Sequence, residues 1–262
     1  MSAPETTADF KTKAGALFSG FSSASIAQMH KELAEEFCLT KDVVAEAASY
    51  SMAMVVRFAL GLSASGGKVC SIAKDTLAGY VALATIRHLV NAGAQAQVLL
   101  LLDPGVAVSQ ELTNQVTALE KLGVMLPDPE SADEMDAFTQ FLKDSHNIIF
   151  GIYNPGASSD EFITAISELL NEERTPVHCI EAPPGLNVDT GLAEPGALYA
   201  SSTLSLGAPL KGLNKGKDFV GRHYVCDISF ARSTYAKHGS DLTGLFAEQP
   251  VQQIYPTMTD ES

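Results

Sequence analysis

The chain has 262 residues, of which 46% are hydrophobic, and a formal net charge of −14. This length fits one large α/β domain with a sizeable core better than two domains. The negative charge and the lack of any Lys/Arg run argue against direct nucleic-acid binding, because phosphates repel an acidic surface. The sequence contains no stretch of 18 apolar residues, so we expect no membrane span. The first residues include the acidic Glu5 and Asp9, so we expect no leader peptide. We therefore expect a cytoplasmic protein.

The cysteines predict neither disulfides nor a metal site. Cys38, Cys70, Cys179 and Cys226 lie far apart, and no pair has metal-ligand spacing. The last three lie within apolar, strand-like runs. We expect free thiols, buried in the strands.

The N-terminal quarter is predicted to be helical after a flexible segment at residues 1–22. Residues 25–36 have apolar side chains at helical spacing, at Ile26, Met29 and Leu33. Thr40 is a good N-cap for a second helix that runs to about Leu60. This second helix is apolar on most sides, so we expect it to lie between the sheet and another element or to form part of an oligomer contact.

A βαβ unit at residues 68–103 organises the rest of the chain. Val69–Ala73 is predicted to be a buried strand, Leu77–Asn91 a helix closed by Gly93, and Val98–Leu102 a second parallel strand. In a doubly wound sheet, a ligand lies where a strand hands over to its helix. Here that turn is residues 74–76, and it contains no glycine.

Strands and helices continue to alternate after this unit. We predict helices at residues 108–121, 135–143 and 162–171, the last capped by Ser158 or Ser159, and strands at 147–153, 176–181, 197–206 and 221–228. This alternation predicts an α/β fold: a Rossmann-like, three-layer αβα sandwich with a mostly parallel sheet. We place the single domain at residues 23–252 and a tail at 253–262.

Polar residues at the predicted strand ends are the candidate site. Glu181 closes an apolar strand, so we expect it to be partly buried, and with Lys211 it forms a candidate acid/base pair. The alternative is that the aspartates are turn formers and caps and that the lysines are solvated. His88 and His178 are expected to be packing histidines. The candidate ligand-binding residues are Lys74, Asp75, Thr76, Asn154, Gly156 and Asp189.

Over residues 24–250 the order of motifs resembles the YjeF N-terminal domain family. That family includes the NAD(P)H-hydrate epimerases, also called apolipoprotein A-I-binding proteins, and the C-terminal domain of the enhancer-of-decapping scaffold. The most specific match is Pro184-Gly-Leu-Asn-Val-Asp-Thr-Gly191. The matching segments are Val44–Ala53, Ala84–Gly93, Asn147–Gly156, Ile180–Gly191, Leu206–Leu213 and Gly221–Ser229.

The resemblance also shows where this chain departs from the family pattern. The family's phosphate-cradling Gly-Pro-Gly-Asn-Asn-Gly-Gly-Asp loop falls on Lys74–Val81, so we expect Leu77, Tyr80 and Val81 to occupy the place of the cradle. A potassium-binding aspartate of the family falls on Phe150. The Asp and Ser of its Asp-Ile-Pro-Ser-Gly motif fall on Glu181 and Pro184. The family's Ala-Pro-Lys lysine falls on Leu210, one position before Lys211.

These departures favour a divergent family member that lacks epimerase activity and serves as a scaffold or complex subunit. We expect protein partners and a homodimer, no nucleic acid and no membrane, no metal site and no cofactor. Two alternatives stay open. One is an active epimerase that interconverts the R and S forms of NAD(P)HX, with Glu181 as acid/base, Lys211 assisting and potassium bound. The other is a module whose remodelled pocket binds another nucleotide or small ligand.

Overall fold

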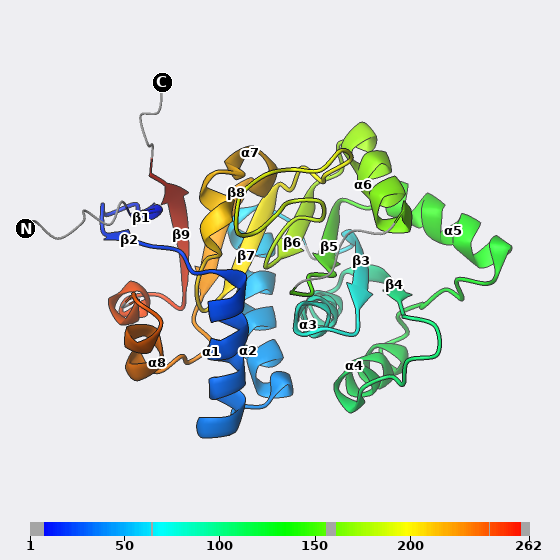
Figure 1. The fold of residues 1–262 in the computed structure, drawn as a ribbon. Coiled ribbons are helices and arrows are strands. Elements are labelled where there is room, and N and C mark those ends of the chain that lie inside the picture. The colour runs from blue at the N-terminus through cyan, green and yellow to red at the C-terminus, as the bar shows by residue number, and fades with distance from the viewer. Residues whose placement is uncertain (1–7, 64, 156–160, 241, 258–262) are drawn as a thin grey trace, which may run out of the picture.

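A computed structural model describes residues 8–257, except for residues 64, 156–160 and 241. Nine strands form one sheet in the order β2-β1-β9-β8-β7-β6-β5-β3-β4 (Figure 1). Strands β3 to β8 run parallel, whereas β9, β1 and β2 add antiparallel pairs at one edge. The strands are β1 (Phe10–Thr12), β2 (Leu17–Phe18), β3 (Lys68–Lys74), β4 (Gln95–Leu101), β5 (Asn147–Gly151), β6 (Val177–Ile180), β7 (Ser202–Leu206), β8 (Arg222–Cys226) and β9 (Val251–Pro256).

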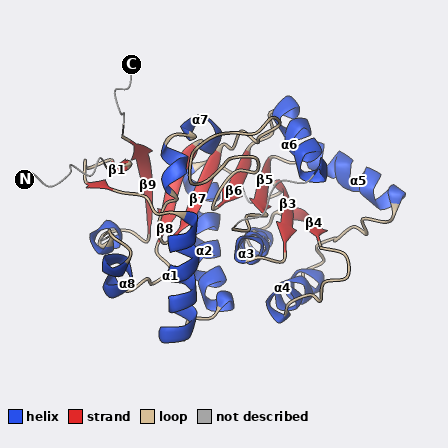
Figure 2. Ribbon diagram, in the orientation of Figure 1, coloured by secondary structure: helices blue, strands red, loops and turns tan. Residues whose placement is uncertain are grey.

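Helices cover both faces of this sheet (Figure 2). They are α1 (Ser23–Glu36), α2 (Lys41–Met54), α3 (Leu77–Asn91), α4 (Gln110–Lys121), α5 (Ala132–Lys143), α6 (Glu161–Glu173), α7 (Lys217–Val220) and α8 (Arg232–Lys237). A π-helical turn, η1 (Val55–Ala59), continues α2, and 3-10 turns lie at η2 (Lys211–Asn214) and η3 (Thr243–Phe246). Within the part of the chain that the structure describes, no helix is both long and apolar enough to cross a membrane.

The alternation of side chains along β3 divides the core into two layers. Val69 and Ala73 pack in the cluster that contains the buried faces of α1 to α4. Cys70 and Ile72 pack in the cluster that contains the buried faces of α5 and α6. Successive residues of a strand point to opposite faces, so one short apolar run serves both layers. The predicted three-layer αβα sandwich is confirmed.

Two glycines let α3 approach the sheet closely. A Cβ on Gly79 would lie 1.9 Å from the carbonyl oxygen of Lys74, and a Cβ on Gly151 would lie 2.5 Å from that of Ala78. Neither distance is possible for a real side chain. Gly79 therefore serves the packing of α3 against β3, and the first turn of α3 is held at the end of that strand.

The ends of the chain differ from the expected boundaries at residues 22 and 252. Strand β1 pairs with β9, with Phe10 opposite Pro256 and Thr12 opposite Ile254. The Phe10 side chain is buried against the ring of His223. In the described residues, β1 and β2 thus lie before the expected boundary at residue 22. The strand β9, which follows β8, continues past the expected boundary at residue 252. Strands β1 and β2, of three and two residues, are too short to leave a periodic signal in the sequence.

Candidate functional site

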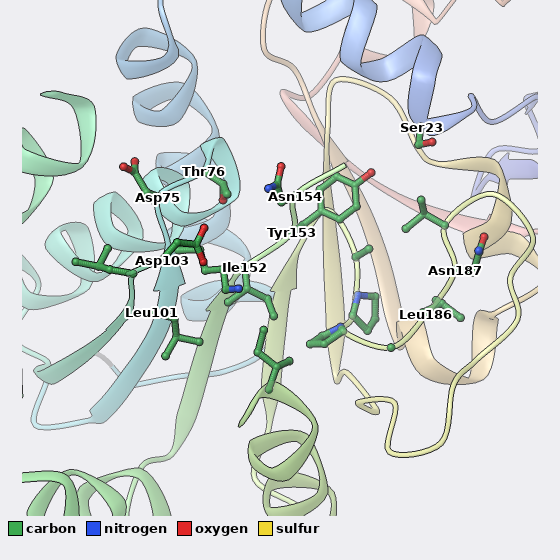
Figure 3. A pocket seen from close by; sticks show the side chains of 18 of the residues that line it. Ser23, Asp75, Thr76, Leu101, Asp103, Ile152, Tyr153, Asn154, Leu186 and Asn187 are labelled. Atoms are coloured by element: carbon green, nitrogen blue, oxygen red, sulfur yellow. The ribbon is translucent and has the colours of Figure 1, made fainter. Parts of the chain in front are cut away.

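The candidate site lies at the carboxyl ends of the parallel strands, beside the point where the strand order of the sheet reverses. The chain proceeds outward from β3 to β4 and then returns to β5 on the other side of β3, which is where doubly wound folds bind ligands. A cleft of about 790 Å³, the main cleft, opens there. In Figure 3, Asp75 and Thr76, which follow β3, lie on one side of Tyr153 and Asn154, which follow β5. Ser23 and the loop after β6 close the other side.

The Asp75 carboxylate in the main cleft accepts three hydrogen bonds. Its Oδ2 accepts from the Ser109 backbone N–H at 2.8 Å, and its Oδ1 lies 2.6 Å from both the Ser109 and Tyr80 hydroxyls. Burial opposes ionisation of Asp75, but the bonds from Ser109 and Tyr80 outweigh it and hold the pKa of the carboxyl below its ordinary value. Ser109 is the N-cap of α4. The Asp75 carboxylate therefore joins the ends of β3, α3 and α4.

Asp189 makes the same arrangement on the opposite wall. Its Oδ1 accepts from the Ser23 backbone N–H at 2.9 Å, and its Oδ2 accepts from the Ser23 hydroxyl at 2.5 Å. Ser23 begins α1. At two helix starts beside the cleft, the backbone and hydroxyl donors that an anionic ligand would use are thus already bonded to aspartates of the chain.

The charges of the main cleft disfavour an anion. Among its described lining residues, four are acidic and one is basic. The acidic residues are Asp75, Asp103, Asp189 and Glu194, and the basic residue is Lys74. At an effective dielectric constant of about 20, a carboxylate and a phosphate charge about 6 Å apart repel by about 3 kcal/mol. A pyrophosphate in this cleft would meet several such interactions.

A second cavity of about 490 Å³ lies beside the main cleft, between α1, α2 and the ends of β5 to β7. Glu181 forms part of its wall. It is only 3% exposed and has a φ of 68°, a left-handed conformation that is unusual for a non-glycine residue. Its Oε1 lies 3.8 Å from His30 Nε2, which is longer than a hydrogen bond, and its buried Oε2 has no hydrogen-bond partner. Burial raises the pKa of Glu181 above its ordinary value.

Tyr153 lies on both cavities. Its buried hydroxyl, like Glu181 Oε2, has no hydrogen-bond partner. Burial and the nearby Glu181 and Asp189 carboxyls raise its pKa. A buried acid and a buried hydroxyl, together with the buried His30 Nε2, which also has no hydrogen-bond partner, are groups that could bind a polar ligand atom.

Comparison with known proteins places the chain in a family. The model of the YjeF-related protein N-terminus matches residues 41–212, well over half of the chain. The chain belongs to the YjeF_N family. The bifunctional NAD(P)H-hydrate repair enzyme Nnr of Thermofilum pendens is 25% identical over 215 residues, which is 80% of this chain and 40% of that enzyme. The crystal structure of yeast YNL200c superposes with a TM-score of 0.76 at 22% identity, covering 90% of this chain and 100% of that one, which shows a common fold.

The two positions that the resemblance aligns with potassium ligands carry no side-chain oxygen in this chain. Phe150 is buried in the core layer under α5 and α6, and Pro184 has no side-chain donor or acceptor. Hard cations need oxygen ligands. Among the described residues, no group of three or more His, Cys, Asp or Glu side chains is arranged to hold a metal ion.

The bulky residues that align with the YjeF_N phosphate loop lie elsewhere than expected. Tyr80 and Val81 are buried, and neither lines either cavity. Tyr80 instead directs its hydroxyl at Asp75, and only Leu77 reaches a cavity, the second one. Neither Tyr80 nor Val81 therefore fills the main cleft.

The other candidate residues fall into three groups. Lys74, Thr76 and Asn154 line the main cleft together with Asp75 and Asp189. Thr76 is also the N-cap of α3, since its Oγ1 accepts from the Gly79 N–H at 3.2 Å. Gly156 lies outside the described residues. Lys211 is exposed and lines neither cavity, so the structure does not bring it together with Glu181.

The histidines and cysteines mostly match their expected packing roles. His178 is buried, with its ring nitrogens 2.9 Å from the Ser202 hydroxyl and 2.5 Å from Asn147 Oδ1, and burial lowers its pKa to about 4. His88 is half-buried, 3.0 Å from Glu46. All four cysteines are free, three of them buried and Cys38 exposed.

Sequence reasoning missed His30, Tyr153, Ser23 and Ser109. His30 and Ser23 lie on α1, more than 150 residues from their partners Glu181 and Asp189, and no local pattern signals such contacts. Ser109 was detectable, because a serine at the start of the predicted helix at 108–121 is a typical N-cap. Tyr153 is the last residue of the predicted strand at 147–153, at the strand end where site residues gather.

Proposed function

We propose that this YjeF_N protein does not epimerise NAD(P)H-hydrates and instead serves as a scaffold or subunit of a protein complex. The observation that carries the proposal is the bonding of Asp75 and Asp189 to Ser109 and Ser23. A dinucleotide phosphate would have to displace a carboxylate from each helix start. The acidic lining of the main cleft and the apolar residue at position 150 support the same proposal.

Calorimetric titration with NADPH-hydrate, together with an epimerisation assay, tests this proposal. We expect neither heat of binding nor turnover at ligand concentrations up to about 1 mM, with an active epimerase of the family as the positive control. Binding in the micromolar range with turnover would refute it. The scaffold role is tested by sizing the native protein from its source cells, where we expect a particle heavier than two copies of the chain.

The second cavity favours one alternative function, the binding of a small, largely apolar ligand. Its described wall is mostly aliphatic, with Glu181 and Tyr153 supplying unpartnered polar atoms. A carboxyl with a raised pKa is suited to donate a hydrogen bond or a proton. A thermal-shift screen of wild type and Glu181→Gln separates the two functions. Ligands that stabilise only the wild type support this alternative. If epimerisation is measured for the wild type and Glu181→Gln abolishes it, Glu181 is an acid/base and the main proposal is wrong.

A further inference from the structure

A third cavity, of about 650 Å³, lies at the opposite end of the sheet from the main cleft. Its walls are formed by the loop between η1 and β3 and by residues at the starts of five neighbouring parallel strands. The residues that begin or directly precede β3, β5, β6, β7 and β8 are Gly67, His146, Pro176, Ser201 and Arg222. We call this the amino-edge cavity. Its volume is typical of small-molecule sites.

The charges of the amino-edge cavity are the reverse of those in the main cleft. Its described lining contains no Asp or Glu, although the chain has 31 of them. It does contain Arg222, which is exposed and has no ion-pair partner among the residues that the structure describes. Arg222 Nη1 donates to the Ala59 carbonyl oxygen at 3.2 Å, so the guanidinium is fixed at the end of η1. Its other N–H groups are left for an anion.

A buried relay makes the Asn147 amide a second donor. His178 is 1% exposed, and burial lowers its pKa to about 4, so the ring is neutral at pH 7. Its Nε2 lies 2.5 Å from Asn147 Oδ1, and its Nδ1 lies 2.9 Å from the Ser202 hydroxyl. Because an amide oxygen only accepts, Nε2 carries the ring proton and Nδ1 accepts from Ser202. The Asn147 Nδ2 group is then left to donate to a ligand of the cavity.

His146 supplies a third donor. Its Nδ1 accepts from the Lys68 backbone N–H at 2.9 Å, and its own backbone N–H donates to the Lys68 carbonyl oxygen at 2.9 Å. A ring nitrogen that accepts carries no proton, so the proton of the neutral His146 ring lies on Nε2. Arg222, Asn147 and His146 therefore line one cavity with N–H donors, which is the chemistry that recognises an anion.

The surroundings favour an anion with a single charge. Helices α3, α5 and α6 end at this edge of the sheet, shortly before β4, β5 and β6 begin, and helix C-termini carry partial negative charge. These helix ends oppose a doubly charged phosphate more than a singly charged group. A carboxylate also matches the planar fork of the Arg222 guanidinium. Leu60 and Leu62 give the cavity an apolar wall for the rest of such a molecule.

We propose that the amino-edge cavity binds a small organic carboxylate, with Arg222 and the Asn147 amide holding the carboxylate group and Leu60 and Leu62 covering the apolar part. The site is separate from the main cleft and does not depend on the proposed function. The competing interpretation is that Arg222 only caps η1 through the Ala59 carbonyl. A cap would affect the stability of the fold but not the binding of a carboxylate.

Titration of the full-length, ¹⁵N-labelled chain with sodium butyrate, followed by NMR at constant ionic strength, tests the proposal. We expect shifts of the Asn147 side-chain amide and the Gly67 backbone amide, with a dissociation constant of about 1 mM for so small a ligand. Butyramide, the neutral analogue, and inorganic phosphate should each bind at least tenfold more weakly. No shift with about 50 mM butyrate, or equal affinities for butyrate and butyramide, overturns the proposal. Tighter binding of phosphate overturns the assignment to a carboxylate.

Two variants test the residues. Arg222→Gln should weaken butyrate binding at least tenfold. Lys121→Gln is the matched control, because it removes the same charge from an exposed residue that lines none of the three described cavities. Asn147→Asp keeps an oxygen to accept from His178 but places a negative charge in the cavity, so it should abolish binding.

The structural interpretation of Arg222 is excluded by comparing two readouts. If Arg222→Gln lowers the melting temperature but binds butyrate like the wild type, Arg222 is only a cap and the proposal is wrong. The His178 tautomer, read from its ring ¹⁵N shifts, gives an independent check. A proton on Nδ1 in place of Nε2 would turn the Asn147 oxygen toward the cavity and overturn the role of Asn147 as a donor.

Discussion

Removing the hydroxyl of Tyr80 tests the interpretation of Asp75 as a charged structural residue. Tyr80→Phe keeps the buried ring and deletes the bond of 2.6 Å to Asp75 Oδ1. A hydrogen bond to a charged group contributes about 1.5–3 kcal/mol, but Asp75 is partly accessible to water, so we expect a loss of about 1–2 kcal/mol at pH 7. For a chain of this size, that loss lowers the melting temperature by about 2–6 °C.

The pH dependence gives the sharper test. The folded state holds the pKa of Asp75 below its ordinary value, so its stabilising effect is present above the unfolded pKa of about 3.9 and is lost as the pH falls through the folded pKa. The difference between wild type and Tyr80→Phe, measured by urea unfolding, should be constant from pH 7 to pH 5 and shrink below pH 4. Tyr199→Phe, at an exposed site, should change stability by less than about 0.5 kcal/mol. A difference for Tyr80→Phe that is as small as this control, or that does not change with pH, would refute the reasoning.

Three further results are expected. Gly79→Ala should destabilise the fold by about 3 kcal/mol or more in chemical unfolding, because its Cβ would meet the Lys74 carbonyl. Gly244→Ala is the control and should be nearly neutral, because a Cβ there meets nothing within 4 Å. Equal effects of the two variants would contradict the packing role of Gly79. Glu181→Gln should raise the melting temperature at pH 8 but not near pH 4. The pKa of Glu181 is raised in the folded state, so ionisation of this buried carboxyl destabilises the folded state as the pH rises. A higher melting temperature at pH 4 as well would contradict this explanation. A thiol reagent should label one cysteine per native chain, Cys38, and four after unfolding; faster labelling of further thiols would show that the sheet opens.

The parallel part of the fold was predictable because its signals are local. Each of β3, β5 and β6 is a short apolar run buried on both faces, and the helix Leu77–Asn91 was predicted with its observed bounds. The antiparallel edge was not predictable. Strands β1, β2 and β9 are only partly buried, and β1 and β2 are very short. The β1 strand pairs with β9 across more than 200 residues, and such pairing leaves no pattern in a single sequence.

The site shows the same limit in a different form. Sequence position correctly gathered Lys74, Asp75 and Asn154 at one cleft, because the carboxyl ends of parallel strands meet there. It did not reveal which way side chains point. Alignment with the family loop suggested that Tyr80 occupies the place of the phosphate cradle, whereas helical geometry turns that ring into the core and leaves its hydroxyl at Asp75. Orientation depends on packing, and packing depends on residues far away in the chain.

The pairing of β1 with β9 has a consequence for how the domain folds and how it can be shortened. These strands join the first and last described segments, so their contact closes the largest loop in the chain and is expected to form late. A chain begun at residue 23 would leave one edge of β9 unpaired and remove the buried ring of Phe10. Unpaired edges of this kind recruit strands from other molecules. The short N-terminal hairpin thus protects the sheet from edge-to-edge aggregation.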